Sequence, residues 1–280
     1  MIEFLVWLAF LFFPGLAMGE FFALWRKDDP LSIRVAWAFG IGMSFNVALF
    51  FLRNFMPLGV LDTTLLSAVL ASVLLSTSLA ARRRFSFPKM PTRTELPLLL
   101  LLLLQFSLVL GHFAKFPVFP QTRSADFVAH VRVVTDYANG WIPPVDAQVL
   151  YYGAYYLLSP LLAIGGGLPL VAIQQGIGLL VALSPLAVYL ASDRLFGDRK
   201  STLTITAVYV LSGFVWFGMV FNSGLYPNFY SVLASFWLIA MVVQFTKDEG
   251  FTSIMISTDK KSFRFSGLWL SRLPLLTLIL

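Results

Sequence analysis

The sequence has no cysteine among its 280 residues, and only two of its residues are histidine. Disulfide bridges, thiol nucleophiles and cysteine-ligated metal sites are therefore excluded. Charge is also scarce, because Asp, Glu, Lys and Arg together make up 12% of the chain, about half of their usual share in soluble domains. So few charges disfavour a water-soluble globular fold.

Long apolar runs dominate what is present. Hydrophobic residues make up 58% of the chain, and the mean hydropathy is +0.82. A bilayer core about 30 Å thick takes about 20 apolar residues of helix, so runs of this length predict membrane spans. Seven runs qualify and an eighth ends with the chain: 2–25, 35–52, 60–81, 97–114, 168–192, 201–222, 229–246 and 266–280. We predict an all-α fold, a polytopic transmembrane helix bundle of about seven spans plus a partial eighth, with a helical extracytoplasmic loop.

The basic residues predict how the helices are oriented. The net charge of +6 and the isoelectric point near 9.7 would suit nucleic acid, but the Lys and Arg residues lie in short clusters between apolar runs. Cytoplasmic loops of membrane proteins carry such clusters. If the first helix ends inside, 15 Lys and Arg residues lie inside and 4 outside. We predict an integral protein of a prokaryotic plasma membrane, with membrane lipids as partners and no nucleic acid.

The apolar stretch 151–167 decides this count. It is short, contains Pro160, ends in three glycines and begins with tyrosines, which favour the membrane interface. If this stretch crossed the membrane, 8 Lys and Arg residues would lie inside and 11 outside. We therefore expect a re-entrant or interfacial helix, and an external segment that extends from residue 115 to residue 167.

This topology divides the chain into three regions. They are an N-terminal four-helix membrane region (1–114), an extracytoplasmic loop with short and re-entrant helices (115–167), and C-terminal membrane helices (168–280). The last region ends inside the eighth apolar run, after an unusually polar stretch from 252 to 266. On this basis we expect the chain to be the N-terminal part of a larger protein.

The external segment begins with an expected helix. Ser124 is a suitable N-cap for a helix from 125 to about 139, and Gly140 is a suitable residue to end it. The helix would lie just outside the membrane, where its polar side chains meet water. It is the part of the external segment in which polar residues are most regularly spaced.

Two polar pairs lie on different faces of this expected helix. Asp126 and His130 are four residues apart, with Arg123 just before them, and Arg132 and Asp136 form the second pair. For the second pair the simplest interpretation is a salt bridge. The first pair leaves two interpretations open: a capping carboxylate with a structural histidine, or a general base or metal ligand beside an imidazole that binds phosphate.

Several strings in the chain appear in a characteristic order. They are SADFVAHV (124–131), the turn GWIPP (140–144), the tyrosine-rich stretch after it, and DRLFGDRK (193–200) at the end of a long apolar run. Together with the predicted topology they resemble the GT-C superfamily of multispanning membrane glycosyltransferases, over residues 110–230. In that family an essential acid lies in the first large external loop. Here that loop follows the fourth helix, so three helices would be an N-terminal addition.

The resemblance implies a transferase that uses a polyprenyl-phosphate sugar as donor. Asp126 would be the catalytic acid of the loop, which takes the proton of the acceptor hydroxyl or holds a divalent cation, the only cofactor implied. Arg123, His130 and Arg132 would stabilise the charge of the leaving phosphate. Asp136 completes the substrate-binding set as a weaker second acid.

Two other functions stay open. A polytopic transporter or flippase should hide ionisable residues at mid-membrane and break its helices at symmetric positions, and the apolar runs show neither feature clearly. A non-catalytic fragment of a larger membrane protein would share the topology without any turnover.

Overall fold

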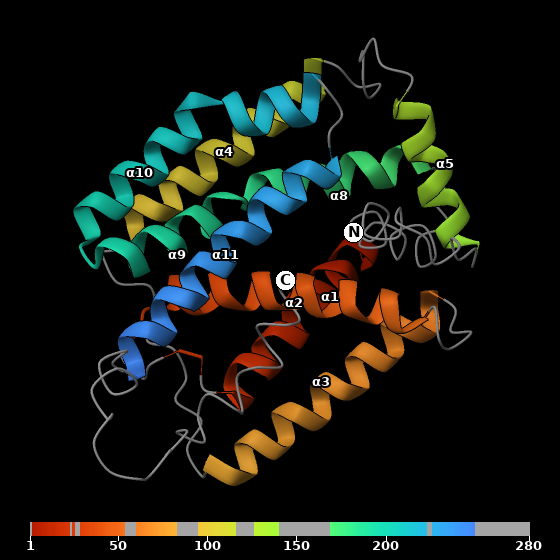
Figure 1. Ribbon diagram of the computed structural model, residues 1–280. Coiled ribbons are helices and arrows are strands. Elements are labelled where there is room, and N and C mark those ends of the chain that lie inside the picture. Colours follow the sequence, from red (N-terminus) through yellow and green to blue (C-terminus); the bar gives the residue numbers. More distant parts are fainter. Residues whose placement is uncertain are drawn as a thin grey trace, which may run out of the picture.

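The computed structural model describes residues 2–22, 24–25, 29–53, 60–82, 95–115, 126–139, 169–222 and 226–249. Every regular element within these ranges is a helix (Figure 1). In chain order the helices are α1 (Ile2–Phe21), α2 (Leu31–Arg53), α3 (Val60–Arg82), α4 (Leu96–Lys115), α5 (Asp126–Ala138), α8 (Pro169–Leu183), α9 (Pro185–Phe196), α10 (Arg199–Ser212), the π-helix η1 (Phe214–Asn222) and α11 (Tyr226–Glu249).

These helices agree closely with the predicted runs. Six spans are long and apolar enough to cross a bilayer, if α8 with α9 and α10 with η1 are each counted as one, and α1 contains a shorter apolar helix, Leu5–Phe21. The prediction of an all-α fold of membrane type is therefore confirmed for the described part of the chain. The eighth run, 266–280, and the stretch 151–167 lie outside it.

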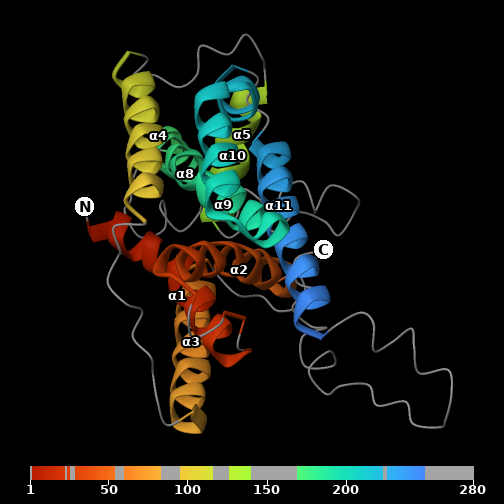
Figure 2. The same ribbon diagram turned by 90° about the vertical axis from the view of Figure 1, so that its left-hand side faces the viewer.

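The span formed by α8 and α9 lies at the centre of the bundle. Most of its residues are buried, and α2, α4, α10 and α11 pack against α9 (Figure 2). The helix is interrupted at Ser184, because Pro185 has no N–H to donate to the carbonyl of Val181. That carbonyl accepts instead from the backbone N–H and hydroxyl of Ser184 and from Nε2 of Gln105, at 3.2, 2.7 and 3.3 Å. The interruption is thus accommodated in an apolar interior.

The first three helices pack through small residues and one buried asparagine. A Cβ atom at Gly42 would overlap the carbonyl oxygen of Leu11, so α1 and α2 approach at backbone contact. Nearby, Asn46 Nδ2 donates to the carbonyl oxygen of Phe10 at 2.8 Å, and Asn46 Oδ1 accepts from the Ser67 hydroxyl at 3.2 Å. The side chain of Asn46 therefore joins α1, α2 and α3.

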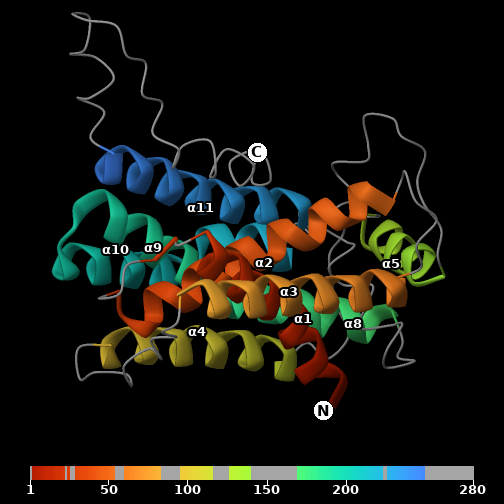
Figure 3. The same ribbon diagram turned by 90° about the horizontal axis from the view of Figure 1, so that it is seen from below.

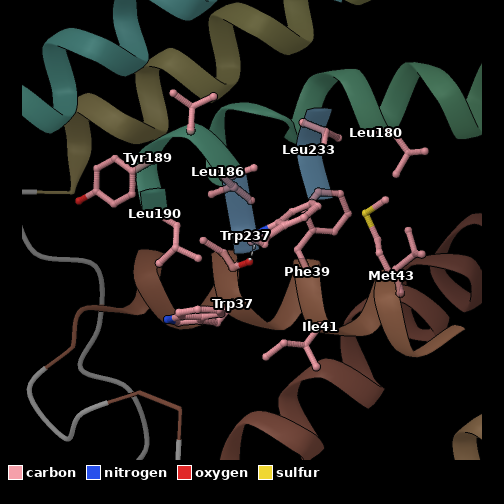
Figure 4. Close-up of a cluster of buried hydrophobic side chains, with 14 of the residues drawn as sticks. Trp37, Phe39, Ile41, Met43, Leu180, Leu186, Tyr189, Leu190, Leu233 and Trp237 are labelled. Carbon is pink, nitrogen blue, oxygen red and sulfur yellow. Dashed lines mark hydrogen bonds between the residues drawn. The ribbon is translucent and has the colours of Figure 1, made fainter. Parts of the chain in front are cut away.

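Trp237 attaches α11 to α2. Its indole ring lies over Gly40, where any side chain would overlap the ring, and its Nε1 donates to the carbonyl oxygen of Ala36 at 3.1 Å. Phe39 meets the same indole edge to face, with ring centroids 5.4 Å apart (Figure 4). Tyr189 of α9 is buried in the same cluster, so large side chains fill the middle of the bundle.

The bundle has two distinct ends. Gln105 bonds to the Val181 carbonyl and Phe113 lies against Gly178, so α4 and α8 are antiparallel and α4 ends where α8 begins. Helix α5 lies at this end, which we call the α5 end, and the turn between α9 and α10 lies at the opposite end, which we call the turn end (Figure 3). The chain therefore leaves α4 and enters α8 at the same end, as the predicted external segment requires.

Candidate functional site

Helix α5 is held on the bundle by its buried face. His130 is 3% exposed, and Val134, one turn later, is fully buried. The centroid of the His130 imidazole lies 4.7 Å from that of the Tyr226 ring, and Tyr226 is the first residue of α11. Helix α5 also packs against α8. Burial raises the pKa of the Tyr226 hydroxyl, so this ring stays neutral. Aromatic and apolar contacts therefore dock the helix.

The opposite face of α5 carries the predicted salt bridge. Arg132 Nε lies 3.7 Å from Asp136 Oδ2, and the Arg132 side chain is 83% exposed. An exposed pair of this kind contributes little to stability, because water and salt screen it. The pair instead presents charged side chains to solvent at the α5 end.

The structure separates the predicted substrate-binding residues. Asp126 is the first residue of α5, and Arg123 lies between two described ranges, outside the described residues. His130 packs into the bundle whereas Arg132 points away from it, so these two do not share a surface. Its burial favours a packing role for His130 over direct contact with a phosphate. The catalytic role of Asp126 and the role of Arg123 stay predictions.

The divalent cation has no ligand set in the described ranges. No group of three or more His, Cys, Asp or Glu side chains there could hold a metal ion. The carboxylates that are described lie apart, at the two ends of the bundle, and several are used in ion pairs and helix caps. No catalytic step is therefore assigned to such an ion.

A histidine surrounded by rings lies in the last turn of α4. The imidazole of His112 stacks on Phe221 at 4.3 Å with an interplanar angle of 23°, and it meets the edge of Phe217 at 5.4 Å. Phe221 and Phe217 belong to η1, which follows Gly213 at a left-handed φ of 58°. We call His112, Phe217 and Phe221 the α4–η1 rim. From the sequence, His112 is expected to be an interface residue, and its contacts with these rings could not be predicted because a π-helix leaves no clear signal in an apolar run.

A buried ionic cluster lies at the turn end. The guanidinium of Arg194, in the last turn of α9, lies 2.8 Å from the carboxylate of Asp29 and 3.5 Å from that of Asp193. The side chains of Arg194 and Asp29 are each 10% exposed. Lys247 of α11 donates to the backbone carbonyl of Arg194. The cluster therefore joins the segment before α2 to the ends of α9 and α11.

Glu95 adds α4 to this cluster. Its buried carboxylate accepts the backbone N–H of Ser32 at 2.8 Å, in the first turn of α2. That N–H has no acceptor within its own helix, and the carboxylate also faces the positive end of the α2 dipole. Arg34 Nε donates to the carbonyl oxygen of Asp29 at 3.2 Å. These bonds use the charges of the turn end to hold helix ends together.

The sequence contains part of the signal for this cluster. Arg194 belongs to the string DRLFGDRK, and Asp29 belongs to the charged link between the first two runs. The topology count included Arg194 as a loop charge and left out Asp29, so it gave no reason to pair residues so far apart in the chain.

Comparisons with known proteins give no relative. The chain matches no protein-family model, no curated protein and no solved structure. Its function is therefore argued from its residues and their geometry.

Proposed function

We propose that the protein is a GT-C-like membrane glycosyltransferase that acts at the α5 end, on the extracytoplasmic side of the membrane. The acceptor hydroxyl oxygen attacks the anomeric carbon of a sugar carried on polyprenyl phosphate. The new glycosidic bond forms as the bond from carbon to phosphate oxygen breaks, with inversion at the sugar. The hydroxyl proton passes to the carboxylate of Asp126, and polyprenyl phosphate leaves as an anion.

The observation that carries this proposal is the two-faced helix α5. One face is docked on the bundle through His130 and Val134, and the other presents Arg132 and Asp136 at the surface. An amphipathic helix docked at the end of a membrane bundle is a suitable support for catalytic groups that meet a lipid-linked substrate. The reaction itself is the one that the resemblance to the GT-C superfamily implies, and the docking of α5 supports a site on this helix.

The resemblance implies a role for each candidate residue on or beside α5. Asp126, at the first residue of the helix, is the general base. Arg132 is the exposed cation available to a phosphate, Asp136 orients it through their salt bridge, and Arg123 would add a second cation just before the helix. His130 is the group that keeps α5 seated.

The interior of the bundle favours an enzyme over the transporter alternative. A transporter places ionisable groups near mid-membrane. In the described spans, Asp, Glu, Lys, Arg and His lie toward helix ends. The polar side chains deeper in the bundle, Gln105 and Asn46, are neutral and bond to backbone carbonyls.

The test is transfer of a labelled sugar by the full chain in proteoliposomes. A panel of tritiated polyprenyl-phosphate hexoses is the donor, and loss of label from the lipid is measured. We expect Asp126→Asn to lower the rate by at least about a hundredfold, the usual contribution of a general base. The matched control is Asp62→Asn, at an exposed acid in the first turn of α3. Equal rates for wild type and Asp126→Asn would overturn the proposal, as would an equal loss in the control.

A further inference from the structure

The α4–η1 rim is open on both of its helices. Phe221 is buried beneath the imidazole of His112, but Phe217 is 37% exposed. Each helix has a glycine beside the ring pair, Gly111 on α4 and Gly218 on η1, and a Cβ atom at either one would meet no atom within 4 Å apart from its chain neighbours and the nearby backbone of its own helix. A ligand could therefore approach the backbone of both helices closely.

Positive charge lies next to this open surface. Lys115 follows His112 by three residues, which places both on neighbouring positions of the last turn of α4. Lys115 is exposed and belongs to the minority of Lys and Arg residues that the topology puts outside, 4 against 15. At the end of a span, this small surface offers a lysine and an imidazole to a lipid headgroup and an exposed ring to an acyl chain.

We propose that the α4–η1 rim binds one anionic glycerophospholipid through its phosphate. Lys115 and His112 donate to the phosphate oxygens, and a fatty acyl chain lies along Phe217 and over Gly218. The charge of the headgroup complements that of Lys115, the imidazole N–H of His112 adds a hydrogen bond, and the exposed ring offers apolar area to the acyl chain. This site does not depend on the proposed transfer reaction, since it requires neither Asp126 nor a sugar.

The experiment captures the lipid where it binds. Benzoylphenylalanine at position 217 keeps an aromatic ring there and, on irradiation, reacts with whatever lies against it. The full chain is placed in nanodiscs with equal amounts of phosphatidylglycerol and phosphatidylcholine, and the captured lipids are counted by mass spectrometry. The same photoreactive residue at Leu211, a 71% exposed position before η1, reports the lipids that merely surround the protein.

We expect phosphatidylglycerol to be enriched about fivefold at position 217 and not at 211, because one basic residue near an anionic headgroup supplies about that preference. Lys115→Ala and His112→Ala should each reduce the enrichment, and Lys115→Arg should retain it. Gly218→Leu should lower capture of phosphatidylglycerol without a change of charge, because its side chain fills the open space.

Three results would overturn the proposal. The first is equal enrichment at positions 217 and 211. The second is enrichment that persists in both Lys115→Ala and His112→Ala. The third is displacement of phosphatidylglycerol from position 217 by an equimolar polyprenyl phosphate, which would make the rim a site for a different lipid. Loss of sugar transfer in Asp126→Asn with normal lipid capture would separate this site from the proposed active site.

Discussion

The two ends of the bundle are joined by different chemistry. At the α5 end, helices meet through rings and apolar side chains, as His130 does with Tyr226. At the turn end they meet through buried charges, with Asp29 and Arg194 at the centre. A buried charge that loses its partner is strongly unfavourable, whereas ring and apolar contacts depend on packing. The turn end therefore depends on charge pairing, and the α5 end depends on packing.

The largest expected effect comes from breaking the ionic cluster. Arg194→Met leaves the carboxylate of Asp29 buried without its partner, and we expect it to lower the free energy of unfolding by about 3 kcal/mol. Denaturant titration in detergent micelles measures the change. The double variant Asp29→Asn, Arg194→Met should recover much of the loss, because the more deeply buried of the two carboxylates that face Arg194 is then uncharged. If the single and double variants were equally destabilised, the ionic explanation would be wrong.

The next effect tests how α5 is docked. Tyr226→Ala removes the ring that contacts His130, and loss of a large buried aromatic side chain costs about 3 kcal/mol of local packing. We expect α5 to leave the bundle more often. A cysteine placed at Val134, in this naturally cysteine-free chain, should then react with maleimide more than tenfold faster, by the conversion of about 1.4 kcal/mol per tenfold.

Tyr226→Phe is the control for this experiment, since it keeps the ring and removes only the hydroxyl. Its labelling rate at position 134 should stay close to that of the parent. Unchanged labelling in Tyr226→Ala would mean that contacts with α8 alone hold α5.

A smaller effect is expected from the exposed pair on α5. Arg132→Ala removes a screened surface salt bridge, so the free energy of unfolding should fall by only about 0.3 kcal/mol. The contrast with Arg194→Met is the direct measure of the difference between the two ends. A loss above about 1 kcal/mol would show that Arg132 makes further contacts that stabilise the fold.

The smallest effect concerns pH at the turn between α9 and α10. The hydroxyl and backbone N–H of Ser201 donate to the carboxylate of Asp198 and hold its pKa below the ordinary value. The ionised form is thus favoured in the folded state, and its contribution is present above pH of about 4 and lost as the pH falls further. Asp198→Asn keeps a capping side chain but should make the thermal midpoint less dependent on pH between about 6 and about 3. An unchanged dependence would contradict this role.

Much of the fold could be predicted because lipid imposes strict rules on a chain. The expected run 60–81 is observed as Val60–Arg82, and the run 97–114 as Leu96–Lys115. The helix expected at 125–139 is observed as Asp126–Ala138. Apolar length, N-caps and helix-ending glycines are local signals, and local signals fix where helices lie in the sequence.

What could not be predicted depends on contacts between distant residues. Asp29 and Arg194 are separated by 165 positions, and the topology count treated Arg194 as a loop charge and did not consider Asp29. Similarly, α5 carries a polar pair on each of two faces, so its sequence alone did not show that the face with His130 is buried. Contacts with α8 and with Tyr226 of α11, both later in the chain, decide which face docks.

The fit of Trp237 to Gly40 has a consequence for how the protein is assembled. The ribosome completes α2 long before it makes Trp237, which bonds to a carbonyl 201 residues earlier in the chain. Until α11 enters the membrane, the backbone at Gly40 lacks the indole ring that covers it. The late helix therefore completes a site prepared by an early one, and α11 is the last of the described helices to be made.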